Sequence, residues 1–157
     1  DTQLHEVKVF DRQGNLQNTF GGRGDEQGEF YHPLTVAISS TDTVYIVDSF
    51  HFAVQAFDLA GNFLFSFGPI EGGMGIMARP RDITFDSDNN LYVTDAVRNN
   101  VQIYDSEGNY LLAFGERGAI NGQFRLPAGI SIDDDNFIYI SDSINRRIQV
   151  FQYLSQT

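Results

Sequence analysis

The six residues FDRQGN at positions 10–15 occur again as FDLAGN at 57–62 and as YDSEGN at 104–109. Each copy begins 47 residues after the previous one, at positions 10, 57 and 104, and Phe151 lies where a further copy would start. The Asp of this motif can accept backbone N–H bonds, and its Gly can take a left-handed conformation. The motif therefore predicts a tight turn that closes a β-hairpin once in every repeat.

Other positions keep the same spacing, with no insertion or deletion between the copies. They are Pro33, Pro80 and Pro127; Tyr45, Tyr92 and Tyr139; Asp48, Asp95 and Asp142; and Phe20, Phe67 and Phe114, each followed by Gly. Within one period, runs of alternating apolar residues separated by polar turns predict four short strands. Four-stranded sheets that repeat at this spacing cover each other's faces when they stack radially. The sequence therefore predicts an all-β fold, a β-propeller of four-stranded antiparallel blades.

Three long segments resemble NHL repeats: GEFYHPLTVAISSTDTVYIVDS, ARPRDITFDSDNNLYVTDAVRNNVQIYDSEGN and GQFRLPAGISIDDDNFIYISDSINRRIQVF. The NHL pattern has Gly-x-Phe, then Pro, Gly-Ile-x-Val-Asp, Tyr-Val-x-Asp and Asn-x-Arg-Val-x-Val-Phe. The third segment matches it best, and the resemblance covers nearly the whole chain. It implies a 47-residue NHL-type repeat in a propeller that typically has six blades.

The repeat alignment divides the chain into four parts of one partial propeller, residues 1–157. Residues 1–20 would form the last two strands of a blade, 33–67 and 80–114 two full blades, and 127–153 three strands of a further blade. At 47 residues per blade, 157 residues give about 3.3 repeats, whereas a six-bladed ring needs about 280 residues. We expect the chain to be part of a longer six-bladed protein. Two alternatives stay open: two chains that complete one ring, or an arc docked permanently on a partner.

The charge and composition exclude several kinds of partner. Asp and Glu outnumber Lys and Arg by 21 to 10, and the net charge of −11 disfavours both nucleic acid and an anionic membrane surface. No run of apolar residues is long enough to span a membrane, so no membrane insertion is expected. The absence of Cys excludes disulfides and thiolate metal sites. Acidity and the absence of Cys favour a bacterial location outside the cytoplasm, in the periplasm or at the cell surface.

A partner-binding face is predicted where the copies differ from one another. The segments after the second strand of each blade read SFHFA (49–53), AVRNN (96–100) and SINRR (143–147). Aromatic residues and Arg dominate the energetics of protein interfaces. The predicted partner-binding residues are Phe50, His51, Phe52, Arg98, Asn99, Asn145 and Arg146, joined by Tyr31, His32, Met77 and Arg79 from the links between blades. The alternative for Phe50 and Phe52 is that one or both pack under a neighbouring link.

These residues favour a non-catalytic interaction scaffold that binds a protein or peptide partner, or the remaining blades of the same ring. The resemblance extends to amidating lyases, and more distantly to lactonases, which would carry a metal site in the central channel. His5, His32 and His51 do not occupy equivalent positions, so the sequence predicts no metal ligands, no catalytic residues and no cofactor. RNA binding, known for some NHL domains, would need a basic face despite the charge of −11.

Two sets of acids have a structural explanation. Asp48, Asp95 and Asp142 recur once per blade, which favours a role in holding backbone N–H groups over a cation site. Asp133, Asp134 and Asp135 align with DSD at 86–88 and SST at 39–41, so they are expected in the turn between the first two strands of a blade.

Overall fold

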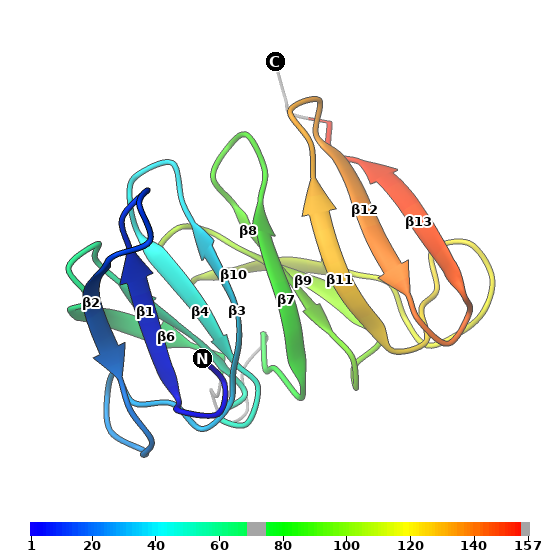
Figure 1. The fold of residues 1–157 in the computed structure, drawn as a ribbon. Helices are drawn as coiled ribbons and strands as arrows, with labels where there is room; N and C mark the ends of the chain where they lie inside the picture. Colours follow the sequence, from blue (N-terminus) through cyan, green and yellow to red (C-terminus); the bar gives the residue numbers. More distant parts are fainter. Residues whose placement is uncertain (69–74, 155–157) are drawn as a thin grey trace.

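The computed structural model describes residues 1–68 and 75–154, and in this part of the chain the regular secondary structure consists of β-strands alone. Four antiparallel sheets stand side by side in an arc (Figure 1). The first is a two-stranded sheet, β1 (Glu6–Phe10) and β2 (Leu16–Gly21). The next is a four-stranded blade of β3 (Pro33–Ile38), β4 (Val44–Asp48), β5 (Ala53–Phe57) and β6 (Phe63–Phe67).

The remaining strands repeat this arrangement. A second four-stranded blade contains β7 (Pro80–Phe85), β8 (Leu91–Asp95), β9 (Asn100–Tyr104) and β10 (Tyr110–Phe114). The last sheet has three strands, β11 (Pro127–Ile132), β12 (Phe137–Asp142) and β13 (Arg147–Gln152). The prediction of an all-β propeller with four-stranded antiparallel blades is therefore confirmed.

The hydrophobic core lies between the sheets. One cluster joins the two complete blades, with Tyr45 and Val54 on the first and Ile83 and Leu91 on the second. A second cluster joins the second blade to the three-stranded sheet, and a third joins the β1–β2 hairpin to the first blade. Burial on this scale supplies the main driving force for stacking the sheets, since it removes apolar surface from water.

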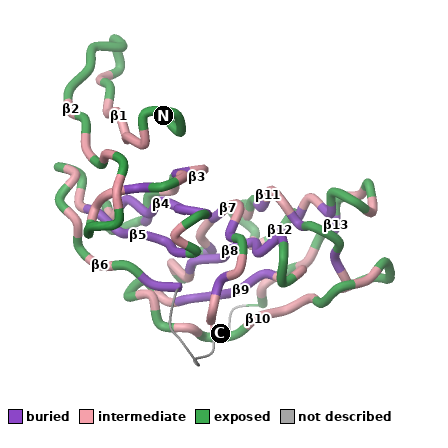
Figure 2. The backbone as a smooth tube through the Cα atoms, turned by 90° about the horizontal axis from the view of Figure 1, so that it is seen from below, coloured by how far each residue is buried: buried purple, intermediate pink, exposed green. Residues whose placement is uncertain are grey.

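Stacking explains why the strands are more buried than their sequences indicate. The alternating pattern predicts one face of each strand more buried than the other, but every residue of β4, β5 and β8 is buried. These strands lie in the middle of complete blades, and a neighbouring sheet covers each of their faces (Figure 2). No helix in the described residues is long and apolar enough to cross a membrane.

Candidate functional site: the link face

The loops after β4, β8 and β12 and the links between sheets lie on one side of the arc, at the bottom of Figure 1. We call this side the link face; its described residues are 49–52, 96–99 and 143–146 in the loops, and 22–32, 75–79 and 115–126 in the links. The opposite side, the turn face, carries the first hairpin turn of each blade and the D-x-x-G-N turns. The two faces differ in shape and in charge.

A buried Asp at the end of the second strand ties each loop to the link before it. The carboxylate of Asp48 accepts the N–H groups of Tyr31 and His32, at 2.7 and 2.8 Å. The equivalent bonds run from Ala78 to Asp95 and from Arg125 to Asp142, at 2.6 and 2.8 Å. All three Asp residues are fully buried. The predicted structural role of these acids is confirmed.

Burial alone would raise the pKa of the Asp142 carboxyl, because a charge is less stable away from water. Hydrogen bonds from the Arg125 N–H, from Asn145 and from Arg147 outweigh this effect and hold the pKa below its ordinary value. The Arg147 Nε atom lies 2.8 Å from the carboxylate. Asn145 and Arg147 are the Asn-x-Arg pair of the third copy, so this motif stabilises the buried acid.

Four aromatic side chains of the first blade meet on the link face, and we call them the aromatic cluster: Tyr31, His32, Phe50 and His51. The rings of His32 and Phe50 stack with centroids 4.6 Å apart, and those of Tyr31 and His51 meet edge to face at 5.1 Å. His51 is held from both sides, with Nδ1 at 2.9 Å from Asp48 and Nε2 at 3.3 Å from Asp25. Phe50 nevertheless remains 53% exposed. The cluster is thus a rigid apolar surface open to solvent.

Phe52 lies beside this cluster in the chain and has an unusual backbone conformation. Its φ is 55°, in the left-handed region, which is rare for bulky residues and costs free energy. The same register position is left-handed in every sheet, and its other occupants are His5, Asn99 and Arg146. The side chain of Phe52 is 47% exposed. Phe50 and Phe52 are thus each about half exposed, and Phe50 stacks on His32 of the neighbouring link without being enclosed by it.

Arginines gather on the link face next to the second blade and the last sheet. We call five of those with no carboxylate within 4.0 Å in the described part of the chain the arginine group: Arg79, Arg81, Arg98, Arg125 and Arg146. Arg79 and Arg81 line a pocket of about 230 Å³ together with Leu126 and Ser143. Sequence reasoning missed Arg81 and Arg125, although both stand close to predicted residues.

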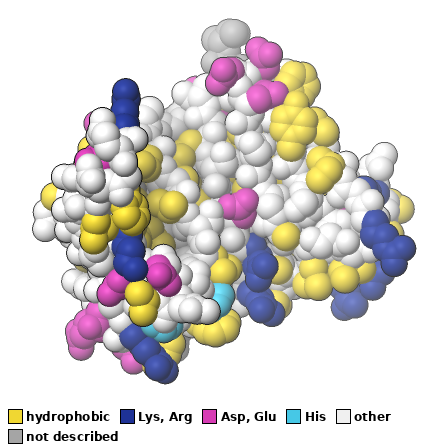
Figure 3. All heavy atoms as spheres, viewed as in Figure 1, with side chains coloured by type: hydrophobic (Ala, Val, Ile, Leu, Met, Phe, Trp, Pro, Cys, Tyr) yellow, Lys and Arg dark blue, Asp and Glu magenta, His cyan; other side chains and the backbone are white. Residues whose placement is uncertain are grey.

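Basic residues are concentrated on the link face and acidic residues on the turn face, although the link face also carries Asp25, Glu26, Glu29 and Glu116. Of the ten Lys and Arg residues, the link face or the strand ends beside it hold Arg23, Arg79, Arg81, Arg98, Arg117, Arg125, Arg146 and Arg147. The turns of the turn face hold ten acids and one base, Arg12: Asp11, Asp42, Asp58, Asp86, Asp88, Asp105, Glu107, Asp133, Asp134 and Asp135. Figure 3 shows dark blue side chains along the lower edge, with some magenta ones at the lower left, and a magenta group at the top. Next to the second blade and the last sheet, the link face is thus locally basic despite the net charge of −11.

Three predicted binding residues are used inside the fold. Asn99 donates to the Val97 carbonyl at 2.8 Å and accepts the Leu126 N–H at 3.1 Å. Asn145 donates to the Gly118 carbonyl and to Asp142. Met77 is only 2% exposed and packs in the core between the two complete blades. Met77 is therefore not a surface residue, and the two Asn side chains hold the loops in place.

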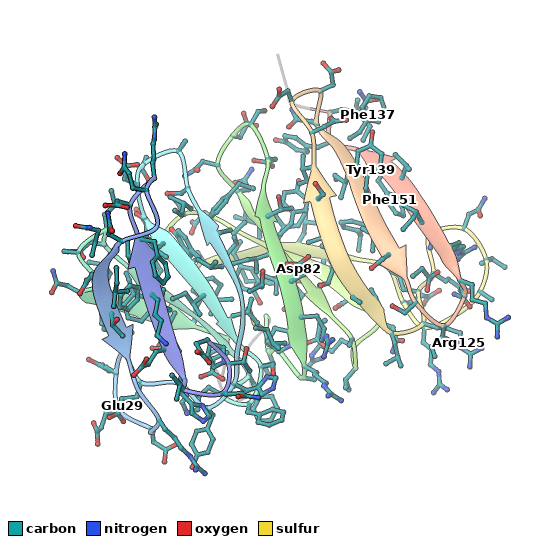
Figure 4. All side chains as sticks on the ribbon, viewed as in Figure 1. Glu29, Asp82, Arg125, Phe137, Tyr139 and Phe151 are labelled. Carbon is teal, nitrogen blue, oxygen red and sulfur yellow. The ribbon has the colours of Figure 1, made fainter. Side chains whose placement is uncertain are left out.

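One further residue on the inner strands was not predicted. Asp82, in β7 at the centre of Figure 4, accepts the Thr35 hydroxyl from β3 at 2.9 Å and the Ile130 N–H from β11 at 2.9 Å. It therefore connects all three inner strands across the arc. No sequence signal pointed to it, because the equivalent residues are Thr35 and Gly129.

The acidic run behaves as the repeat alignment predicts. Asp133 accepts the N–H groups of Asp135 and Phe137 at 3.1 and 2.9 Å, within the turn between β11 and β12. Within residues 1–68 and 75–154, no three His, Asp or Glu side chains come together in a way that would hold a metal ion. The channel metal site of the lyase alternative thus has no ligand set among these residues.

Radially stacked antiparallel blades, with their links on one face and their hairpin turns on the other, define a β-propeller. Residues 78–156, which are 79 of the 157 residues, match the model of the DUF5128 family, described as a 6-bladed beta-propeller. The chain belongs to this family. No curated protein sequence matches it significantly.

Solved structures show the same fold at low sequence identity. Virginiamycin B lyase from Staphylococcus aureus, crystallised as a catalytically inactive variant with quinupristin, is 12% identical with a TM-score of 0.68; the match covers 97% of this chain and 50% of the lyase. An auxiliary nutrient binding protein from Bacteroides thetaiotaomicron is 16% identical with a TM-score of 0.69, covering 94% and 42%. The chain thus spans about half the length of these propellers or less. At such identities the likeness extends to the fold only.

Proposed function

We propose that this propeller is a non-catalytic binding module that captures a protein or peptide partner on its link face, and that its blades are NHL-type repeats. The observation that carries the proposal is Phe52, a bulky residue kept in a left-handed conformation while its side chain stays half exposed. Strain of this kind is enriched at functional sites. Because this position is left-handed in every sheet, the unusual feature is the aromatic residue and not the conformation. The aromatic cluster beside it provides rigid apolar area, which is the usual anchor of an interface.

The arginine group indicates the chemical character of the partner. Guanidinium groups bind carboxylates with two parallel hydrogen bonds, and five of them lie on the same face as the aromatic cluster. The partner that fits both parts is a peptide segment with an apolar or aromatic residue followed by acidic residues. The acidic turn face would repel such a segment, so binding is directed to one side of the arc.

A displayed library of random peptides tests this proposal, because selection from it requires no identified partner. Selection on the immobilised chain should enrich peptides that combine aromatic with acidic residues. Their affinity should fall by about tenfold or more when both Phe50 and Phe52 are replaced by Ser, since each is a candidate anchor. Leu59→Ser is the matched control, because Leu59 is similarly exposed but lies on the turn face. Equal binding by the double variant and the wild type would contradict the proposal.

Phe52→Asn separates binding from folding. Asn occupies the same position in the second blade, as Asn99, and tolerates the left-handed conformation better than Phe. The variant should be more stable than the wild type by about 0.5–1 kcal/mol, measured by urea unfolding, and should bind the selected peptides more weakly. A variant that loses stability would show that Phe52 serves packing instead.

One observation favours a second candidate function, a lyase. His51 is oriented by the buried carboxylate of Asp48, as a general base would be, and it lines a pocket of about 230 Å³ with Asp25 and Ser66. The virginiamycin B lyase that shares the fold is inactive as a histidine-to-alanine variant. Cleavage of quinupristin by the chain, lost in His51→Ala, would favour this function. Under the binding proposal no cleavage occurs.

A further inference from the structure

A groove lies between the second blade and the last sheet, and Gly115 and Gly122 of the link between them form part of its lining. Its volume is about 550 Å³, compared with about 230 Å³ for each of the two link-face pockets described above, and its walls are mainly apolar: Tyr92, Ile103, Leu112, Phe114, Ile138 and Phe151. One of its borders is β13, which in the described structure pairs only with β12 and has its other edge open. Figure 4 shows Phe151 on this outer strand.

The two complete blades show what fills the equivalent space. There the third strand pairs with a fourth, β6 or β10, whose first residue is aromatic. Tyr110 of β10 stands against Gly75, where an added Cβ would lie 2.9 Å from its ring, and Phe63 of β6 lies beside Gly28. Gly122 is the next glycine in this series, 47 residues after Gly75, and a Cβ there would have nothing within 4 Å. The groove thus corresponds to the position that the fourth strand takes in the two complete blades.

The residues after β13 do not encode the turn that introduces a fourth strand elsewhere. In the complete blades this turn is D-x-x-G-N, in which Asp58 and Asp105 accept the backbone N–H groups of Asn62 and Asn109. At the equivalent positions, 152–156, the sequence is QYLSQ, without Asp, Gly or Asn. The motif that introduces the fourth strand in the complete blades is therefore absent from the sequence at these positions.

We propose that the groove beside β13 is an acceptor for a separate extended peptide segment that adds a fourth strand to the last sheet. β6 and β10 define its chemistry: FLFSF and YLLAF share an aromatic residue at the first position, Leu at the second and Phe at the fifth. Backbone bonds to the open edge of β13 supply affinity, and the apolar walls of the groove select alternate side chains. No residue of the aromatic cluster or the arginine group lines this site.

A synthetic peptide tests the acceptor site directly. The probe has the sequence of residues 109–115, NYLLAFG, with Lys at both ends and Trp in place of its Tyr. Because the chain contains no Trp, a blue shift of the peptide's emission reports its burial. We expect saturable binding and slower hydrogen exchange of the β13 amides. The same peptide with Pro in place of its second Leu should not bind saturably and should not slow hydrogen exchange of the β13 amides. The reason is that Pro cannot pair as a central strand residue.

Two matched variants locate the site. Leu112→Asp places a charge in the groove and should weaken peptide binding by about tenfold or more. Leu64→Asp, on β6 outside the groove and equally exposed, should bind like the wild type. The proposal fails if the peptide does not bind, if both variants behave alike, or if the β13 amides stay unprotected. It fails equally if a second copy of the chain already protects β13 before the peptide is added.

Discussion

Asp142 shows how single residues hold the link face in shape. Its carboxylate is completely buried, yet hydrogen-bond donors from a link, a loop and a strand surround it: Arg125, Asn145, Arg147 and Gln149. A buried charge is tolerated when such donors replace water. The same position in the first blade, Asp48, also orients His51 in the aromatic cluster. One repeated acid thus supports both the fold and the candidate binding surface.

Replacing Asp142 with Asn should reduce the free energy of unfolding by about 2–3 kcal/mol at neutral pH, because charge-assisted hydrogen bonds are lost. The pKa of Asp142 is lowered in the folded state, so its contribution is present above the ordinary pKa of 3.8 and is lost as the pH falls through the lowered value. Urea unfolding between pH 7 and pH 2 should show wild type and variant converging at the acidic end. Asp134→Asn, in the exposed turn, is the control and should change stability by less than about 0.5 kcal/mol. A constant difference down to pH 2 would contradict this explanation.

The D-x-x-G-N turn of each complete blade packs against the sheet that precedes it. Gly61 of the first blade rests on Phe20 of the hairpin before it, and Gly108 of the second blade rests on Phe67. An added Cβ would lie 2.5 Å from the ring in both cases. The Gly of this motif therefore serves two purposes, a left-handed turn and the close approach of the next blade.

Gly108→Ala should cost more stability than Gly14→Ala, although both glycines are left-handed, with φ of 83° and 86°. At Gly14 a Cβ would meet nothing within 4 Å, so only the backbone penalty of about 1–2 kcal/mol applies. At Gly108 the clash with Phe67 adds about 1–3 kcal/mol. Urea unfolding of the two variants measures the difference. Equal losses would show that the turn does not pack on the preceding blade.

The spacing of these turns is also why the arrangement of the elements was predictable from the sequence. A motif that recurs in register carries the strand pattern with it, and the buried Asp48, Asp95 and Asp142 recur in the same way. Residues whose environment depends on a neighbouring blade were not predictable. Met77 lies in a link rich in Gly, yet it is buried because its sulfur packs over Gly68. Arg81 meets Leu126 and Ser143 in one pocket only because two sheets stack.

At the scale of the whole molecule, the two ends of the arc present surfaces that its interior buries. Ile148 of β13 is 60% exposed, while Val101, at the same register one blade earlier, is completely buried under the last sheet. At the other end, Val36 of β3 is exposed and its equivalent Ile83 is buried. Each end thus has the apolar character of a contact between blades. This agrees with a chain that spans about half the length of the complete propellers that it resembles.

The position of a residue along the arc, and not its type, should therefore decide the effect of a polar substitution. Val101→Ser should reduce the free energy of unfolding by about 3–4 kcal/mol, since it removes buried methyl groups and leaves a hydroxyl in the core. Ile148→Ser should change it by less than about 0.5 kcal/mol, because that side chain is already in contact with water. Urea unfolding, with sedimentation to confirm a monomer at the same concentration, compares the two. A large loss for Ile148→Ser would mean that another molecule covers the last sheet in solution, and the loss would then depend on protein concentration.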